Sequence, residues 1–256
     1  MNKERIMSNE NNEITEDGFI QQYNMREFAP GAVTVDLSIF TIKNGKLSIL
    51  LIKRGGHPEK GKWALPGGFV NVDESLDKAA ARELSEETNI TIEDGYLEQL
   101  KTYGNPYRDR RGYVVSVAYV ALVPQVDRPE AGDDATEAHF FAVEDVLSED
   151  FDIAFDHHNI ISDGLERVRA KIEYAPIAHL FLDDEPFTMS ELRNVYEIVW
   201  GDELIPSNFR RKVQSVPGFL EPVGTKRTSS VDGGRASDLY RAGKAKEIFP
   251  PFKRSE

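Results

Sequence analysis

One stretch constrains this chain more than any other: residues 68–90, GFVNVDESLDKAAARELSEETNI. From Leu76 onward the apolar residues recur at helical intervals, and Ser75 stands where its side chain can cap the first turn. Asn89 marks the C-terminal end of the pattern. The stretch therefore predicts a glycine-containing turn followed by one amphipathic helix.

Three glutamates of this helix lie on or beside its apolar face. At about 100° per residue, Glu83 and Glu87 fall within the apolar stripe and Glu86 lies next to it. A charged run on a helix is more often a solvated face. Carboxylates that face a core repel each other and lose hydration, which is tolerated mainly where a cation neutralises them or one keeps a raised pKa. Oxygen ligands on one helix favour Mg²⁺ or Mn²⁺ shared with substrate phosphates.

The spacing of these residues resembles the Nudix box: Gly68, five residues, Glu74, seven residues, then Arg-Glu-Leu-Ser-Glu-Glu. One signature position departs, because Asn89 stands where the family has glycine; asparagine also tolerates a left-handed helix end. The resemblance implies a Nudix α/β/α sandwich with a mixed sheet and a metal-dependent hydrolase site. Gly68 and Glu74 would shape the loop and Arg82 would orient the glutamates. By this resemblance the catalytic residues are Glu74, Arg82, Glu83, Glu86 and Glu87, and the last three are the metal ligands.

Composition sets the outer bounds. The chain has 256 residues, 40% of them hydrophobic, which is enough for two globular domains. It has no cysteine, so disulfides and thiolate metal sites are excluded, and a reducing cytoplasm is compatible. Neither a signal peptide nor a membrane-spanning run is evident, so we expect a cytoplasmic protein with no membrane partner. The polar residues 1–18 are expected to form a disordered extension without a function of their own.

Charge is unevenly distributed along the chain. The net charge of −13 argues against nucleic acid as a partner, yet residues 205–256 contain 11 Lys and Arg against 5 Asp and Glu. An acidic body therefore carries a basic C-terminal end.

Alternating and apolar runs predict the strands of the first domain, which we place at residues 19–150. Asn44-Gly45 predicts a hairpin turn between the first two strands. The predicted strands are 32–42, 47–52, 96–103 and 113–123, and a last small helix is expected at 143–147.

The loop Asn105–Gly112, NPYRDRRG, contains three arginines. It is either a solvated turn or a cluster that binds phosphate beside the metal. In the Nudix family, a proline about sixteen residues beyond the box accompanies ADP-ribose-type substrates, and Pro106 stands there. A later acidic segment resembles the stretch that returns a carboxylate to the site, with Asp133, Asp134 and Glu137 as candidates. The predicted substrate-binding residues are Arg54, Gly68, Pro106, Arg108 and Arg111.

Residues 151–174 read as a linking helix, because Ile161, Leu165, Val168 and Ile172 form one apolar stripe. His157 and His158 lie near its start. No second histidine cluster accompanies them, so they are given no catalytic role.

The segment 175–245 resembles a winged helix-turn-helix domain. Thr188 and Glu191 form a capping box, Gly201 ends that helix, and Ser207 is placed to cap a second one. A hairpin with a basic tip follows, and 246–256 form a tail. The bland alternative is a packing or dimerisation domain. The predicted DNA-binding residues are Ser207, Asn208, Arg210, Arg211, Lys212, Lys226, Arg227 and Arg235.

A Nudix domain followed by a basic winged helix resembles the NrtR-type regulators, Nudix-related repressors of NAD-metabolism genes. The fold expected is α+β, with the Nudix sandwich followed by the winged helix. The resemblance implies a homodimer that binds operator DNA and responds to ADP-ribose or a related nucleoside diphosphate. Because the box glutamates are intact, we also expect hydrolysis of ADP-ribose to AMP and a sugar phosphate. The alternatives are a plain ADP-ribose pyrophosphatase with a dimerisation domain, and a non-catalytic sensor of ADP-ribose or a sugar.

Overall fold

The computed structural model describes residues 31–88, 96–124, 135–182, 186–228 and 236–254. The predicted N-terminal extension, residues 1–18, lies outside them. The first described element is a hairpin of β1 (Ala32–Lys43) and β2 (Lys46–Arg54), paired antiparallel. Asn44 and Gly45 have φ values of 52° and 74°, as a two-residue turn between twisted strands requires. The hairpin predicted from Asn44-Gly45 is confirmed.

The hairpin is part of a mixed seven-stranded sheet with the order β3-β2-β1-β6-β5, in which β4 also pairs with β1 and β7 with β2. Only β1 and β6 run parallel among these pairs; the other pairs are antiparallel. The mixed sheet agrees with the expected fold class. The remaining strands are β3 (Trp63–Ala64), β4 (Gly67–Phe69), β5 (Tyr96–Tyr103), β6 (Val114–Leu122) and β7 (Ala135–Ala142).

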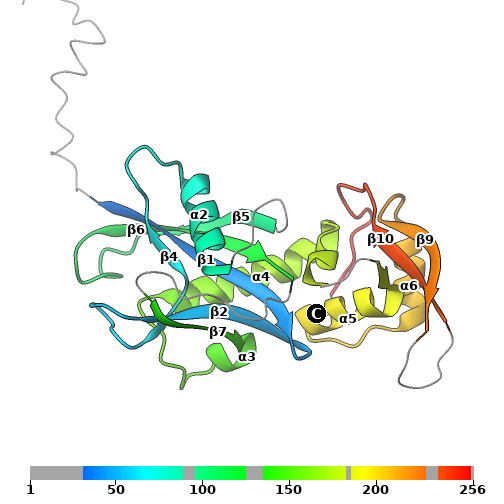
Figure 1. The fold of residues 1–256 in the computed structure, drawn as a ribbon, viewed down its shortest axis with the longest axis horizontal. Helices are drawn as coiled ribbons and strands as arrows, with labels where there is room; N and C mark the ends of the chain where they lie inside the picture. Colours follow the sequence, from blue (N-terminus) through cyan, green and yellow to red (C-terminus); the bar gives the residue numbers. More distant parts are fainter. Residues whose placement is uncertain (1–30, 89–95, 125–134, 183–185, 229–235, 255–256) are drawn as a thin grey trace, which may run out of the picture. The chain divides into compact units, whose positions relative to one another are not determined.

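Two helices cover the sheet on opposite faces. Alternate residues of β1, such as Leu37, share a buried cluster with α2 (Leu76–Thr88). The other face of β1 packs on α4 (His157–Tyr174), where a Cβ at Gly164 would lie 3.2 Å from Ser38. The helix predicted from Leu76 is confirmed. The linking helix predicted over 151–174 is present but begins only at His157, and a short α3 (Val143–Val146) lies close to the predicted small helix. Figure 1 labels these elements.

The C-terminal half contains two helices and a three-stranded sheet of order β8-β10-β9. Thr188 caps α5 (Met189–Trp200) in a capping box with Glu191, and Gly201 ends it with φ 76°. Next comes α6 (Pro206–Gln214), and then the hairpin of β9 (Leu220–Arg227) and β10 (Ser237–Ala242). The remaining elements of this half are η2 (Ala178–Phe181) and β8 (Phe187–Thr188). This is the predicted winged helix arrangement.

Polar contacts fix the end of α4 to α5. Arg169 Nε donates to the carbonyl of Val199 at 3.0 Å, and Trp200 Nε1 donates to the carbonyl of Arg169 at 3.1 Å. Tyr196 donates its hydroxyl to the carbonyl of Ile172 at 3.1 Å. Hydrophobic residues of both helices belong to one core cluster. No helix among the described residues is long and apolar enough to span a membrane.

Candidate functional site

Two glycines bring the start of the box against the sheet. Gly67 has a φ of +150°, and a Cβ there would lie 2.2 Å from the carbonyl oxygen of Val35. A Cβ at Gly68 would lie 2.4 Å from Glu83 Oε1. Because nothing larger than hydrogen fits at either position, the backbone and the Glu83 carboxylate lie in direct contact.

Arg82 connects the acidic residues of the box. Its Nε and Nη2 donate to the two oxygens of Glu74 at 2.9 and 3.1 Å, and its Nη1 donates to Glu83 Oε1 at 2.8 Å and to Glu86 Oε2 at 3.2 Å. The hydrogen bonds from Arg82 to Glu74, with one from the backbone of Asn71, lower the pKa of Glu74 to about 2. The arginine therefore holds three carboxylates in fixed positions.

The metal site predicted on α2 is partly described. Glu83 is 8% exposed, and its burial raises the pKa of its carboxyl against the opposing effect of Arg82. Glu86 is exposed, one turn away. The negative charges of Glu86 and Glu74 raise the pKa of Glu83 further. A bound cation would relieve this repulsion between the carboxylates. The Glu87 side chain lies outside the described residues, within which no group of three or more His, Cys, Asp or Glu is arranged around a metal position. The oxygen donors that are described suit a hard cation such as Mg²⁺ or Mn²⁺.

A cavity of about 240 Å³ opens beside this cluster, and we call it the inner cavity. Its rim is basic and aromatic. The Arg111 guanidinium is bound to Asp109 and lies 5.2 Å from the centre of the Phe69 ring. Arg54 lies 4.8 Å from the centre of the Phe155 ring. Residues that line the inner cavity include Thr34, Asp36, Arg54, Gly68, Phe69 and Arg111.

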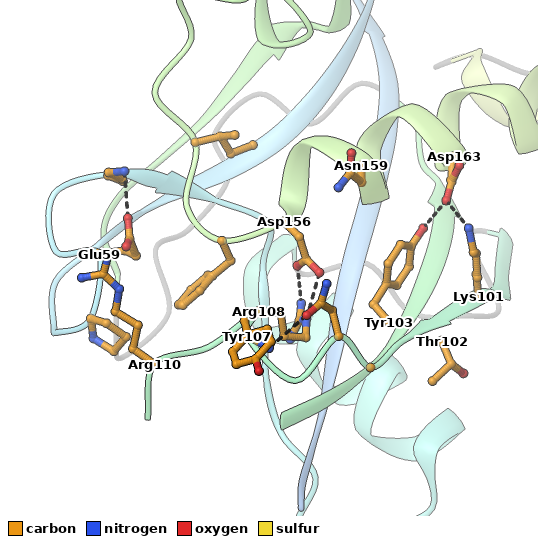
Figure 2. A pocket seen from close by; sticks show the side chains of 16 residues that line it. Glu59, Lys101, Thr102, Tyr103, Tyr107, Arg108, Arg110, Asp156, Asn159 and Asp163 are labelled. Carbon is orange, nitrogen blue, oxygen red and sulfur yellow. Dashed lines mark hydrogen bonds and ion pairs between the residues drawn. The ribbon is translucent and has the colours of Figure 1, made fainter. Parts of the chain in front are cut away.

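Arg108 separates the inner cavity from a larger one. Its side chain is only 4% exposed and is paired with Asp156 at 2.7 Å and with Asp36 at 3.4 Å. The larger, outer cavity has about 890 Å³, and Arg108 and Phe155 line both. Figure 2 shows the outer cavity, with Arg108 bound to Asp156 at its edge. Residues that line it include Lys101, Tyr103, Tyr107, Arg110, Asp156 and Asn159.

The second helix of the winged helix half presents polar residues to solvent. It begins at Pro206 with Ile205 as its N-cap, so the expectation that Ser207 caps this helix is wrong. The reason is the proline, whose fixed φ and missing N–H suit the first helical position. Phe209 and Val213 face the core, while Lys212 is half-buried near the Phe252 ring. The exposed residues predicted to contact DNA on this helix are Ser207, Asn208, Arg210 and Arg211.

The basic residues of the hairpin are partly engaged within the domain. Lys226 pairs with Asp238 at 3.3 Å across the two strands. Arg227 binds Glu191 at 2.7 Å and the carbonyl of Pro186 at 2.6 Å, which ties the hairpin to the start of α5. Arg235 lies outside the described residues. The DNA-binding roles of all three stay predictions.

Comparison with known proteins identifies both halves. Residues 33–163 match the model of the NUDIX domain, and residues 180–242 match that of the NrtR DNA-binding winged helix domain. The chain is 36% identical over 229 residues to the ADPR responsive transcriptional repressor NtrR of Acinetobacter baylyi, covering 89% of this chain and 88% of the relative. The chain belongs to the NrtR family of Nudix proteins.

A pyrophosphatase and two solved structures of one further regulator are also similar to this chain. The ADP-ribose pyrophosphatase of Methanocaldococcus jannaschii is 44% identical over 115 residues, which are 45% of this chain and 64% of that protein. Shewanella oneidensis NrtR in complex with a 27mer DNA is similar over 86% of this chain and 99% of its own, at 33% identity and a TM-score of 0.72. Its Nudix domain with ADP ribose covers 60% of this chain and 99% of its own, at 36% identity and a TM-score of 0.53.

The sequence did not predict a buried polar cluster that lies beside the inner cavity of this NrtR-family Nudix domain. Asp36 accepts hydrogen bonds from the Ser116 hydroxyl and from Arg108. His157 Nδ1 accepts from the backbone N–H of Leu65 at 2.9 Å, and burial lowers the pKa of its ring. The available signal was the alternation of the polar residues Thr34, Asp36 and Ser38 with the apolar residues of the first half of the strand.

The remaining acidic candidates are placed only in part. Glu137 lies on β7, where it pairs with Lys53 at 2.9 Å on the neighbouring strand. Asp133 and Asp134 lie outside the described residues. Pro106 lies in the loop between β5 and β6, as predicted, and is exposed. Arg108, predicted to bind substrate, lines both cavities, and its guanidinium is paired with Asp156 and Asp36; its role in substrate binding stays a prediction.

Proposed function

We propose that this protein is an ADP-ribose-responsive, DNA-binding transcriptional regulator whose Nudix half also hydrolyses ADP-ribose. The observation that carries the proposal is the coexistence of two intact surfaces in one chain. Arg82 holds the carboxylates of the box together by hydrogen bonds beside a cavity, and α6 presents Arg210 and Arg211 to solvent. The complexes of the Shewanella relative support the assignment of ADP-ribose binding to the Nudix half and of DNA binding to the chain.

The hydrolytic part of the proposal rests on the box. Nudix hydrolases as a class use divalent cations such as Mg²⁺ or Mn²⁺. Glu83 and Glu86, with Glu87, would hold the ions, which neutralise diphosphate charge and lower the pKa of a water molecule when bound. Arg82 keeps Glu83 and Glu86 in place, and Gly68 lets a diphosphate approach Glu83 closely. Arg54 and Arg111 at the rim of the inner cavity are placed to attract the phosphate groups.

The regulatory part requires a mechanical link, and α4 supplies one. Asp156, the N-cap residue of this helix, is paired with Arg108, which lines the inner cavity. The last turns of α4 are fixed to α5 by Arg169, Ile172 and Trp200. A ligand that competes with Asp156 for Arg108 would therefore displace α4, and α5 of the winged helix half, which is fixed to the end of α4, would move with it. We further propose that the protein is a homodimer in the cytoplasm. A two-fold symmetric dimer would bind a near-palindromic operator, because each subunit contacts one half-site.

The testing experiment measures binding of the full-length protein to its own upstream DNA at fixed salt, with and without ADP-ribose. A parallel assay follows AMP release from ADP-ribose with Mg²⁺ and with Mn²⁺. The proposal expects specific DNA binding that ADP-ribose weakens, together with AMP release. Release of AMP without any DNA binding would make the protein a pyrophosphatase with an accessory domain. DNA binding that responds to ADP-ribose without AMP release would make it a sensor only.

A further inference from the structure

Residues 246–254, which we call the C-terminal strap, follow the matched winged helix domain, which ends at residue 242. This described segment contains no helix or strand, yet it is firmly anchored. Ile248 and Phe252 are only 2% and 3% exposed and belong to the large hydrophobic core. Pro250 and Pro251 stand between them and restrict the backbone. The strap is therefore held at two buried points that a stiff segment connects.

The backbone of the strap closes the C-terminal end of α4. The last carbonyl groups of a helix have no partner within the helix and need one outside it. The N–H of Ile248 donates to the carbonyl of Tyr174 at 2.7 Å, and the N–H of Phe252 donates to the carbonyl of Glu173 at 2.8 Å. Both acceptors belong to the last turn of α4. A movement of this turn therefore pulls on the strap.

The side chain of Phe252 connects the strap to α6. Its ring centre lies 5.8 Å from that of Phe209, a buried residue of α6, and 5.2 Å from that of Tyr196 on α5. The Nζ of Lys212, a predicted DNA-binding residue, lies 5.8 Å from the same ring centre, within the range of a cation–π attraction. Phe252 thus binds the end of α4 through its backbone and contacts the predicted DNA-binding helix through its side chain.

We propose that the C-terminal strap carries the ADP-ribose response from α4 to α6, and that Phe252 is a positioning residue for the DNA-binding face. The proposal rests on the proposed function, because it assumes that ADP-ribose in the Nudix half weakens operator binding. The contacts between α4 and α5 alone would move the winged helix half as one body. The strap adds a connection that reaches α6 itself, so a shift of α4 changes how α6 presents Arg210 and Arg211.

The experiment measures operator affinity of the full-length protein in Mg²⁺ at fixed salt, with and without the non-hydrolysable analogue α,β-methylene ADP-ribose. The ratio of the two affinities is the coupling factor. Phe252→Ala removes the ring that contacts α6 and keeps the N–H that binds α4. Phe249→Ala is the matched control, because Phe249 lies in the same strap and is 73% exposed. Melting temperatures show whether each variant folds. Phe252→Leu, which keeps an apolar side chain in the core, replaces Phe252→Ala if the alanine variant does not fold.

We expect the coupling factor of the Phe252 variant to shrink at least roughly threefold, with Phe249→Ala at the wild-type value. Affinity for the analogue without DNA should stay close to wild type in both, because the two cavities are lined by residues of the Nudix half. A side chain that only stabilises the fold would lower operator affinity equally with and without the analogue. A wild-type coupling factor in the folded Phe252 variant, or an equal loss in Phe249→Ala, overturns the proposal.

Hydrogen exchange without DNA tests the strap independently of the operator. Binding of the analogue to the wild-type protein should change the exchange rates of the Ile248 and Phe252 amides, which are hydrogen-bonded to α4. Unchanged rates in a protein that binds the analogue overturn the proposal. Changed rates together with an operator affinity that does not respond to the analogue would instead overturn the proposed function, because the strap would then move without regulating DNA binding.

Discussion

The helices α2 and α6 both carry clustered charges, but their charges are held in opposite ways. On α2, Arg82 binds three carboxylates and Glu83 is 8% exposed. On α6, Arg210 and Arg211 are exposed, and the contact described for Arg211 is a 3.3 Å hydrogen bond to Asn208. A small charged ligand needs groups that are oriented before it arrives. A polyanion gains affinity mainly from released counterions, so its protein surface can remain solvated.

The largest expected effect comes from breaking the α2 cluster. Glu83→Gln keeps the shape of the side chain but removes a charge from the proposed metal site, so turnover of ADP-ribose with Mg²⁺ should fall on the order of a hundredfold or more. AMP release measures it. Glu144→Gln, an exposed acidic residue on α3, is the control and should keep wild-type turnover. An active Glu83→Gln protein would show that the buried carboxylate serves structure alone. Operator affinity without ligand should be unchanged in both variants.

The next effect comes from the solvated face of α6. Replacing Arg210 and Arg211 by Ala should weaken operator binding roughly 10- to 100-fold, and each lost phosphate contact should reduce the magnitude of the log–log salt slope by about 0.9. Titrations at several salt concentrations give both quantities. Lys46→Ala, at the hairpin turn of the Nudix half, is the control for a general loss of positive charge. Unchanged binding by the double variant would place the DNA-binding surface elsewhere.

A smaller effect is expected where the two regions are joined. Asp156→Asn removes the charge that fixes Arg108 to the start of α4. The factor by which ADP-ribose weakens operator binding should then shrink roughly three- to tenfold, within the usual range of coupling free energies. Asp163→Asn, further along α4 and bound to Lys101 and Tyr103, is the control (Figure 2). An undiminished ligand effect in Asp156→Asn would remove this ion pair from the path between the sites.

The smallest effect is on stability. Because burial lowers the pKa of His157 below its usual 6.5, the unfolded chain takes up a proton first as pH falls. The contribution of neutral His157 to the free energy of unfolding is fully present above about pH 6.5. It is lost as pH falls toward the pKa of His157 in the folded protein, at up to about 1.4 kcal/mol per pH unit. His157→Asn, which can still accept from Leu65, should show a flatter dependence in denaturant titrations. His158→Asn, an exposed neighbour, should match the wild type. Equal slopes in all three proteins would refute this assignment.

The sequence predicted local features well and long-range contacts poorly. The Asn44-Gly45 turn, the Thr188–Glu191 capping box and the end of α5 at Gly201 are short-range features, and each was correct. Periodicity also placed the buried Glu83. The pairing of Arg108 with Asp36 and Asp156 could not be predicted, because it joins residues 72 and 48 positions apart. The sequence of the basic loop Asn105–Gly112 would be the same whether its arginines contact a ligand or pair with buried carboxylates.

The same limitation applies to the C-terminal half. The amphipathic pattern of α6 predicted its exposed arginines, because the buried positions of Phe209 and Val213 define the helix face. The assignment of Arg227 to DNA alone did not allow for the distant Glu191, which binds it in the folded domain. Such competition between an internal partner and an external one depends on tertiary structure.

The central claim is that the preorganised Nudix site and the solvated DNA-binding face are energetically coupled. The most direct measurement is the affinity of the full-length protein for α,β-methylene ADP-ribose with and without saturating operator DNA, in Mg²⁺ at fixed salt. Linkage requires operator DNA to weaken ligand binding by the same factor by which the ligand weakens operator binding, roughly 5- to 150-fold. That reciprocal loss is the predicted result. Equal ligand affinity with and without DNA, from a protein that binds both, would contradict the account and leave two independent functions in one chain.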